Sequence, residues 1–205
     1  MTSALIITGT DTGVGKTVVS AVLTLALRAT YWKPVQSGCD EETDSETVSR
    51  LTDQPVLPET YRLQTPASPH FSAAAEGVII KAMPLPDTHG PLVVEGAGGA
   101  LVPLRNDLLY ADLMACWKAP VVVVARTSLG TINHSLLTIA TLKARDISVL
   151  GVVFVGDEVT DSQEIICRIS KTRSLGRLPV IPHLNRSALV KAAQNLDLAA
   201  IAKAL

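Results

Sequence analysis

Residues 9–17 read Gly-Thr-Asp-Thr-Gly-Val-Gly-Lys-Thr, after the apolar run 4–7 and before the helix-forming stretch 18–28. This order of strand, glycine-rich turn, Gly-Lys-Thr and helix is typical of a loop that binds nucleotide phosphates, because backbone N–H groups and the helix dipole both attract anions. The first glycine lies six positions before the glycine of Gly-Lys, one more than in the common pattern. The alternative is an ordinary strand-to-helix turn; the context favours a nucleotide site.

The loop also predicts individual contacts. We expect the Lys16 ammonium to reach the β- and γ-phosphates and the Thr17 hydroxyl to ligate Mg²⁺. A carboxylate at Asp11 is repelled by a triphosphate unless it faces an amine or a metal, which hints at an amine-bearing substrate. The loop residues expected to bind the nucleotide are Asp11, Thr12, Gly13, Val14, Gly15, Lys16 and Thr17.

The composition is typical of an α/β protein. Of 205 residues 47% are hydrophobic but only 3% aromatic, as expected for strands buried between helices. The length and the lack of linker composition predict one domain over residues 1–205. A net charge of −1 gives no electrostatic reason to bind nucleic acid or an anionic membrane. No membrane span or signal peptide is visible, and the three cysteines have no metal-ligand spacing, so we expect a cytoplasmic enzyme.

Apolar runs of strand length alternate with helical patterns. We expect strands at 4–8, 31–34, 92–95, 121–125 and 149–155, and a less regular one at 178–181. We expect helices at 16–28, 45–51, 108–118, 132–145, 162–171 and 186–205. This alternation predicts a doubly wound, mainly parallel sheet flanked by helices. The proline-rich stretch 55–91 predicts loops around one short helix near 71–76, and such loops often carry substrate sites.

Ligands of a doubly wound sheet bind beyond the carboxyl ends of its strands. Glu95 lies at one such end, before Gly-Ala-Gly-Gly, where a carboxylate can bind Mg²⁺ opposite Thr17. A buried glutamate satisfied by backbone N–H groups is the alternative. Asp44 and Glu46 are further candidate metal ligands in the acidic run 40–46, most of which also fits a solvated loop.

Lys33 follows the second expected strand, where a cation can neutralise phosphate oxygens or a substrate carboxylate or carbamate. A lone lysine is otherwise ordinary surface. Ser37 follows it and is also a common type of turn residue. Asn133 and His134 open the helix expected at 132–145, where free N–H groups suit an anion, although asparagine also serves as an ordinary N-cap.

Together these segments resemble the dethiobiotin synthetase family, in the family's order, from residue 4 to about 155. The matching segments are 9–17, Lys-Pro-Val-Gln-Ser-Gly (33–38), Pro-Ala-Ser-Pro-His (66–70), Val-Glu-Gly-Ala-Gly-Gly (94–99) and Leu-Gly-Thr-Ile-Asn-His (129–134). The longer phosphate loop is itself a family trait. The resemblance implies a P-loop nucleoside triphosphate hydrolase-like fold. It also implies ATP- and Mg²⁺-dependent conversion of 7,8-diaminononanoate and CO₂ to dethiobiotin.

The resemblance implies catalytic roles for four residues. Lys16 and Lys33 would stabilise charge on the phosphoryl group and the carbamate, with Thr12 and Ser37 beside the reacting groups. The carbamate would attack the γ-phosphate of ATP to give a carbamic–phosphoric anhydride, and the second amine would then close the ureido ring. The task of the protein is positioning and charge neutralisation.

The resemblance also implies binding roles. Thr17, Asp44 and Glu95 would hold Mg²⁺, with Asp44 preferred to Glu46 because its sequence context aligns with the family. The diamine would lie on Gly98.

The remaining implied contacts concern the substrate carboxylate and the base. Helix N–H groups near Thr131, Asn133 and His134 of a second subunit would bind the carboxylate, which implies a homodimer. Pro182 would border the base. Many members have Asn after the fifth strand, where this chain has Val155-Gly156-Asp157, so base selectivity stays open.

Other interpretations are a partitioning- or maturation-type P-loop ATPase switch, a cobalamin-type synthetase and a noncatalytic nucleotide-binding module. The switches usually have a second lysine early in the loop, where this chain has Thr-Asp-Thr at 10–12. The synthetases normally carry a further glutaminase domain, for which 205 residues leave no room. A mere binding module has no need of both lysines together with Thr17 and Glu95.

Overall fold

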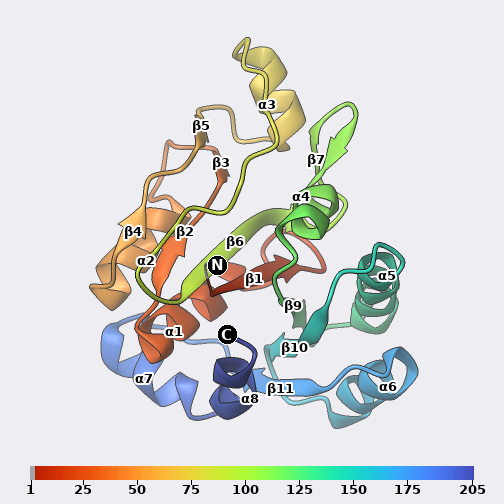
Figure 1. Ribbon diagram of the computed structural model, residues 1–205. Helices are drawn as coiled ribbons and strands as arrows, with labels where there is room; N and C mark the ends of the chain where they lie inside the picture. Colours follow the sequence, from red (N-terminus) through yellow and green to blue (C-terminus); the bar gives the residue numbers. More distant parts are fainter. Residues whose placement is uncertain (1–2) are drawn as a thin grey trace.

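A computed structural model describes residues 3–205 of the protein. Within them, seven strands form a fully parallel central sheet in the order β11-β10-β9-β1-β6-β2-β4 (Figure 1). This confirms the doubly wound parallel architecture. The strands are β1 (Ala4–Gly9), β2 (Thr30–Trp32), β4 (Val56–Leu57), β6 (Leu92–Gly99), β9 (Val121–Arg126), β10 (Val149–Val155) and β11 (Ser174–Leu178).

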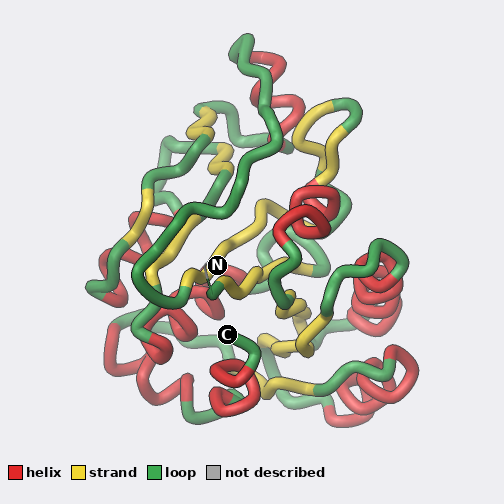
Figure 2. The backbone as a smooth tube through the Cα atoms, viewed as in Figure 1, coloured by secondary structure: helices red, strands yellow, loops and turns green. Residues whose placement is uncertain are grey.

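The helices cover the two faces of this sheet, and Figure 2 shows the strands running between two groups of helices. One face packs against α1 (Lys16–Leu27), α2 (Asp44–Thr52), α7 (Arg186–Ala193) and α8 (Leu198–Lys203). The other packs against α4 (Tyr110–Trp117), α5 (Thr131–Lys143) and α6 (Thr160–Ser170). None of the helices within residues 3–205 is long and apolar enough to cross a membrane.

The strand β9 explains why the sheet is buried on both sides. Val121 and Val123 belong to the apolar cluster on one face, whereas Val122 and Val124 belong to the cluster on the other, and all four are fully buried. Successive side chains of a strand point to opposite faces, so a continuous valine run serves two cores. Burial stabilises the fold by about 1.5–3 kcal/mol for each such side chain.

The loop-rich region contains more structure than the sequence predicts. The expected short helix is α3 (Pro69–Ala75), but β4 and β5 (Tyr61–Leu63) also form there. The strand β5 pairs with β3 (Val35–Ser37), and β7 (Pro103–Arg105) pairs with β8 (Leu108–Leu109). These strands are two or three residues long, too short to show an apolar period.

Three expected strands and one expected helix start have different bounds. The strand expected at 31–34 ends at Trp32, because Pro34 has no N–H to continue the ladder. The strand expected at 92–95 continues to Gly99, and its register against β1 shifts so that Gly9 lies opposite Gly99. The helix expected at 108–118 starts at Tyr110, because residues 108–109 form β8. The strand expected at 178–181 does not form there, because the strand β11 covers Ser174–Leu178 and ends immediately before Pro179.

The helix expected at 186–205 is two helices, α7 and α8. The break occurs where the Asp197 N–H donates to the Leu175 carbonyl of β11. The Asp197 carboxylate then accepts a hydrogen bond from the Ala200 N–H and caps α8. Tertiary pairing with β11 therefore overrides the continuous helical pattern of the sequence.

Gly176 in β11 is expected to be intolerant of a side chain. Its φ is 113°, and an added Cβ would lie 2.1 Å from the Asn195 carbonyl oxygen. Gly176→Ala should therefore lower the free energy of unfolding by about 2–4 kcal/mol, measured by urea denaturation. Gly90→Ala is the control, because an added Cβ there has no neighbour within 4 Å. Equal stabilities of the two variants would contradict this account of β11.

Candidate active site

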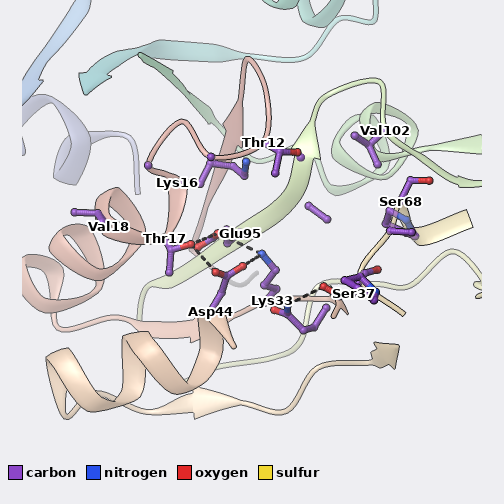
Figure 3. A pocket seen from close by; sticks show the side chains of 18 residues that line it. Thr12, Lys16, Thr17, Val18, Lys33, Ser37, Asp44, Ser68, Glu95 and Val102 are labelled. Carbon is purple, nitrogen blue, oxygen red and sulfur yellow. Dashed lines mark hydrogen bonds and ion pairs between the residues drawn. The ribbon is translucent and has the colours of Figure 1, made fainter. Parts of the chain in front are cut away.

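A cavity of about 730 Å³ opens at the carboxyl edge of the sheet (Figure 3). Its walls come from the loop after β1, the segment between β2 and α2, the end of β6 and the segment 66–69. Of the residues predicted for the site, those that line it are Thr12, Gly13, Gly15, Lys16, Thr17, Lys33, Ser37, Asp44, Glu95 and Gly98. The volume is within the usual range for small-molecule sites.

The loop 9–17 has the backbone conformation of an anion site. Gly13 and Gly15 have φ of 70° and 94°, a region that favours glycine. Among residues 3–205 no side chain caps the start of α1, and its first turn holds no acidic residue, so no side chain competes with an anion for its N–H groups. The Lys16 Nζ donates to the Asp11 carbonyl oxygen of the same loop at 3.0 Å, and burial lowers the Lys16 pKa.

Asp11 has a cationic partner inside the chain. Its Oδ2 accepts a hydrogen bond from Arg126 Nη2 at 2.9 Å, and its Oδ1 accepts one from the Thr12 N–H at 2.7 Å. The hint of a substrate amine is therefore unnecessary, because Arg126 already balances the carboxylate. Arg126 ends β9, the neighbour of β1, so strand adjacency is the signal that sequence reasoning missed.

Two carboxylates and a hydroxyl meet at the centre of the cavity (Figure 3). The Thr17 Oγ1 lies 2.7 Å from Asp44 Oδ1 and 3.0 Å from Glu95 Oε1. The Lys33 Nζ bonds to Asp44 Oδ2 and lies 3.3 Å from Glu95 Oε1. Lys33 is 4% exposed and Glu95 fully buried, so this group is held in low dielectric.

The charges in this group support one another. Burial opposes the charge on Lys33, but Glu95 and Asp44 outweigh it and raise the Lys33 pKa. Burial likewise opposes the charge on Asp44, but Lys33 lowers the Asp44 pKa. The charged side chains that line the cavity are two lysines, Lys16 and Lys33, and two carboxylates, so its wall is electrically neutral.

Tyr31 completes the surroundings of Glu95. Its hydroxyl donates to Glu95 Oε2 at 2.9 Å, and both residues are fully buried. Burial and the nearby carboxylate raise the Tyr31 pKa well above its usual range, so the phenol stays a neutral donor. The sequence contains a signal for the position of Tyr31. Residues two apart on an extended chain point to the same side, and Tyr31 lies two residues before Lys33.

The oxygens in this group suit Mg²⁺. A hydroxyl and two carboxylates are hard ligands, and Mg²⁺ typically takes one or two carboxylates and completes its six ligands with phosphate oxygens and water. Within residues 3–205, no group of three or more His, Cys, Asp or Glu side chains is placed to hold a metal ion. The Glu46 carboxylate instead accepts from the Thr43 N–H at 2.8 Å and from Arg62 at 3.0 Å, outside the cavity lining.

Several predicted residues do not line the cavity. The Val14 side chain is 2% exposed and packs in the core with α1, so only its backbone is available to a nucleotide. Pro182 is exposed on the segment after β11. Thr131, Asn133 and His134 open α5, as expected, away from this cavity.

Solved structures with a similar fold are P-loop ATPases. The septum site-determining protein MinD from Pyrococcus horikoshii OT3, complexed with Mg-ADP, matches with a TM-score of 0.59 and 14% identity over 98% of each chain. A ParA family ATPase from Chlorobium tepidum TLS matches with a TM-score of 0.55 and 10% identity, over 94% of this chain and 98% of the other. At such identities the likeness concerns the fold alone.

Sequence comparison is more specific. A protein-family model described as an AAA domain matches residues 3–188. An ATP-dependent dethiobiotin synthetase from Rhodopseudomonas palustris (strain BisB5) is 58% identical over 92% of each chain. Another from Sphingopyxis alaskensis is 58% identical over 95% of this chain and 96% of its own length. These identities extend over nearly the whole chain, and the protein belongs to the ATP-dependent dethiobiotin synthetase family.

Proposed function

We propose that this protein converts 7,8-diaminononanoate and CO₂ to dethiobiotin, with cleavage of ATP to ADP and phosphate. Its relatives are named ATP-dependent dethiobiotin synthetases. The observation that carries the proposal is the hydrogen-bonded group of Thr17, Lys33, Asp44 and Glu95 beside the phosphate loop, in which Lys33 and Glu95 are buried. This group offers oxygens to a cation and an ammonium to a reacting anion in one cavity.

The chemistry has three steps. One amine of the substrate attacks CO₂ and loses a proton, which gives a carbamate. A carbamate oxygen attacks the γ-phosphorus of ATP and displaces ADP, which gives a carbamic–phosphoric anhydride. The second amine attacks the carbonyl carbon, loses its proton and expels phosphate as the ureido ring closes.

The side chains around the cavity would position these groups and neutralise their charge. Lys16 and the free N–H groups at the start of α1 would bind phosphate oxygens, and Lys33 would face the carbamate. Thr12 and Ser37 would lie beside the reacting groups. The Ser37 hydroxyl supports this role, because it is buried and has no hydrogen-bond partner within the described chain. Gly98 would let the diamine approach the backbone, with φ of 64°.

Thr17, Asp44 and Glu95 would hold Mg²⁺, which would neutralise phosphate charge and hold the triphosphate in line. Their convergence on Thr17 Oγ1 supports this assignment. Asp44 is the first residue of α2, and the adjacent capping box fixes the helix start.

We further propose a homodimer in which Thr131, Asn133 and His134 of one subunit bind the substrate carboxylate held by the other. Exposed apolar side chains just before α5 and in its middle support such an interface, since Leu129 is fully exposed and Leu137 is 60% exposed. Sedimentation analysis that finds a monomer at all concentrations would contradict this arrangement.

We also infer that residues 1–205 form one domain, because both apolar clusters pack on the same sheet. The cytoplasmic location and the absence of nucleic-acid and membrane partners stay predictions.

Base selectivity is expected to be low. Gly156 follows β10, where the family resemblance leads one to expect an Asn, and a Cβ at Gly156 would lie 2.3 Å from Thr127 Oγ1. A base-reading side chain therefore does not fit here, although Pro182 would still border the base. Replacement of ATP by CTP or GTP should leave measurable turnover, and strict dependence on ATP would contradict this expectation.

The test of the function is a reconstitution. The purified protein is incubated with Mg-ATP, bicarbonate and 7,8-diaminononanoate, and dethiobiotin is measured by mass spectrometry with each component omitted in turn. Product that needs every component supports the proposal. Phosphate release without the diamine, and no ureido product with it, would favour the partitioning-type ATPase switch that shares this fold.

A further inference from the structure

The two oxygens of Glu95 have different partners, and we propose that Tyr31 keeps Glu95 a one-oxygen ligand and so favours Mg²⁺ over the larger Ca²⁺. Tyr31 is then a positioning residue that acts through Glu95. The inference rests on the proposed function only in its placement of the cation at Thr17, Asp44 and Glu95.

The position of Tyr31 follows from the sheet. It lies in β2 opposite Val93 of the neighbouring β6, and both belong to the apolar cluster that packs against α1. Glu95 follows Val93 by two residues, so its side chain leaves β6 on the same face. The Tyr31 hydroxyl therefore reaches Glu95 from the side of the buried core. The close-packed core fixes the tyrosine ring.

Each carboxylate divides its oxygens between a support and the cavity. Asp44 Oδ2 bonds to Lys33, whereas Asp44 Oδ1 faces Thr17 at 2.7 Å. Glu95 Oε2 accepts a hydrogen bond from the Tyr31 hydroxyl at 2.9 Å, whereas Glu95 Oε1 faces Thr17 at 3.0 Å and also lies 3.3 Å from Lys33 Nζ. Tyr31 thus holds one carboxylate oxygen of Glu95, as Lys33 holds one carboxylate oxygen of Asp44. One hydroxyl oxygen and one oxygen from each carboxylate remain together for a cation.

Rotation of the Glu95 carboxylate would break this arrangement. It would take Oε2 from the Tyr31 hydroxyl and leave the phenol buried without a partner, which is costly. Mg²⁺ takes six ligands at short distances and readily uses single carboxylate oxygens with water. Ca²⁺ takes six to eight ligands and often binds both oxygens of one carboxylate. A Glu95 that offers one oxygen therefore suits the smaller ion.

The test is Tyr31→Phe, which removes the hydroxyl and keeps the ring. Calorimetry measures Mg²⁺ and Ca²⁺ binding to the protein with a non-hydrolysable ATP analogue. The ratio of Mg²⁺ to Ca²⁺ affinity should fall at least about five-fold in Tyr31→Phe, as expected for loss of one buried hydrogen bond. In turnover assays the Mg²⁺ concentration for half-maximal rate should rise more than kcat falls.

The matched control is Tyr110→Phe. Tyr110 is also fully buried but belongs to the other apolar cluster, and within residues 3–205 it does not hydrogen-bond to Glu95. The ratio of Mg²⁺ to Ca²⁺ affinity of Tyr110→Phe should equal that of the wild-type protein. A folded Tyr31→Phe with an unchanged ratio, or an equal change in both variants, overturns the proposal.

A second measurement needs no variant. Difference infrared spectra of the wild-type protein with and without Mg²⁺ should show the wide splitting of carboxylate bands that one-oxygen coordination gives. A two-oxygen pattern overturns the proposal, and absence of divalent binding overturns it together with the metal assignment. A confirmed affinity shift without dethiobiotin formation would overturn the proposed function alone.

Discussion

Lys33→Ala should lower the rate of dethiobiotin formation by about 10²–10³-fold while Mg-ATP still binds. The Lys33 ammonium is buried against Asp44 and Glu95 and lines the cavity beside Ser37. Its removal takes away a charge that would stabilise the carbamate in the transition state. It also leaves two carboxylates without their shared cation, so divalent-metal affinity should rise. Mass spectrometry measures turnover, and calorimetry measures Mg-ATP and metal binding.

Lys81→Ala is the control for this prediction, because Lys81 is exposed and does not line the cavity. It should leave turnover and binding unchanged. If Lys33→Ala loses turnover and nucleotide affinity to the same extent, then Lys33 binds the ground state and its proposed role is wrong.

The second large effect is expected at Glu95. Glu95→Gln keeps the size of the side chain but replaces one oxygen by an amide NH₂, which cannot ligate a cation and repels Lys33 if it faces the cavity. Mg²⁺ affinity in the nucleotide complex should fall by at least about 10–100-fold, the loss typical when even a supporting partner of a metal ligand is removed. Nucleotide binding measured across an Mg²⁺ titration checks this.

Glu46→Gln provides the matched control. The sequence nominates both glutamates, but Glu46 belongs to the capping box of α2 and pairs with Arg62. Its replacement should leave the Mg²⁺ dependence unchanged. A wild-type Mg²⁺ dependence in Glu95→Gln would remove Glu95 from the metal site.

The sequence predicts the parts of this site that depend on local pattern. The phosphate loop carries its own signature, and parallel strands bring Thr17, Lys33 and Glu95 to one edge of the sheet. The sheet itself follows from apolar runs such as the valines of β9. The choice of Asp44 over Glu46 comes from resemblance, and the structure places Asp44 beside Thr17.

Contacts between distant segments are what the sequence does not predict. Tyr31 of β2 reaches Glu95 of the neighbouring β6, and Arg126 reaches Asp11 across 115 positions of the chain. Neither residue belongs to a motif. In the sequence Tyr31 resembles an ordinary core tyrosine and Arg126 an ordinary surface arginine, and only their positions in the strands distinguish them. The break between α7 and α8 likewise depends on Leu175, which pairs with Asp197 only in the folded chain.

The neutral wall of the cavity has a thermodynamic consequence. A free nucleoside triphosphate that enters the cavity meets two carboxylates, and a free divalent cation meets two ammonium groups. The charged side chains of the wall therefore favour neither ion alone, whereas each ion supplies the charge that the other lacks. If the proposed site holds both, binding of cation and nucleotide is expected to be cooperative, and by reciprocity each would raise the affinity for the other by the same factor.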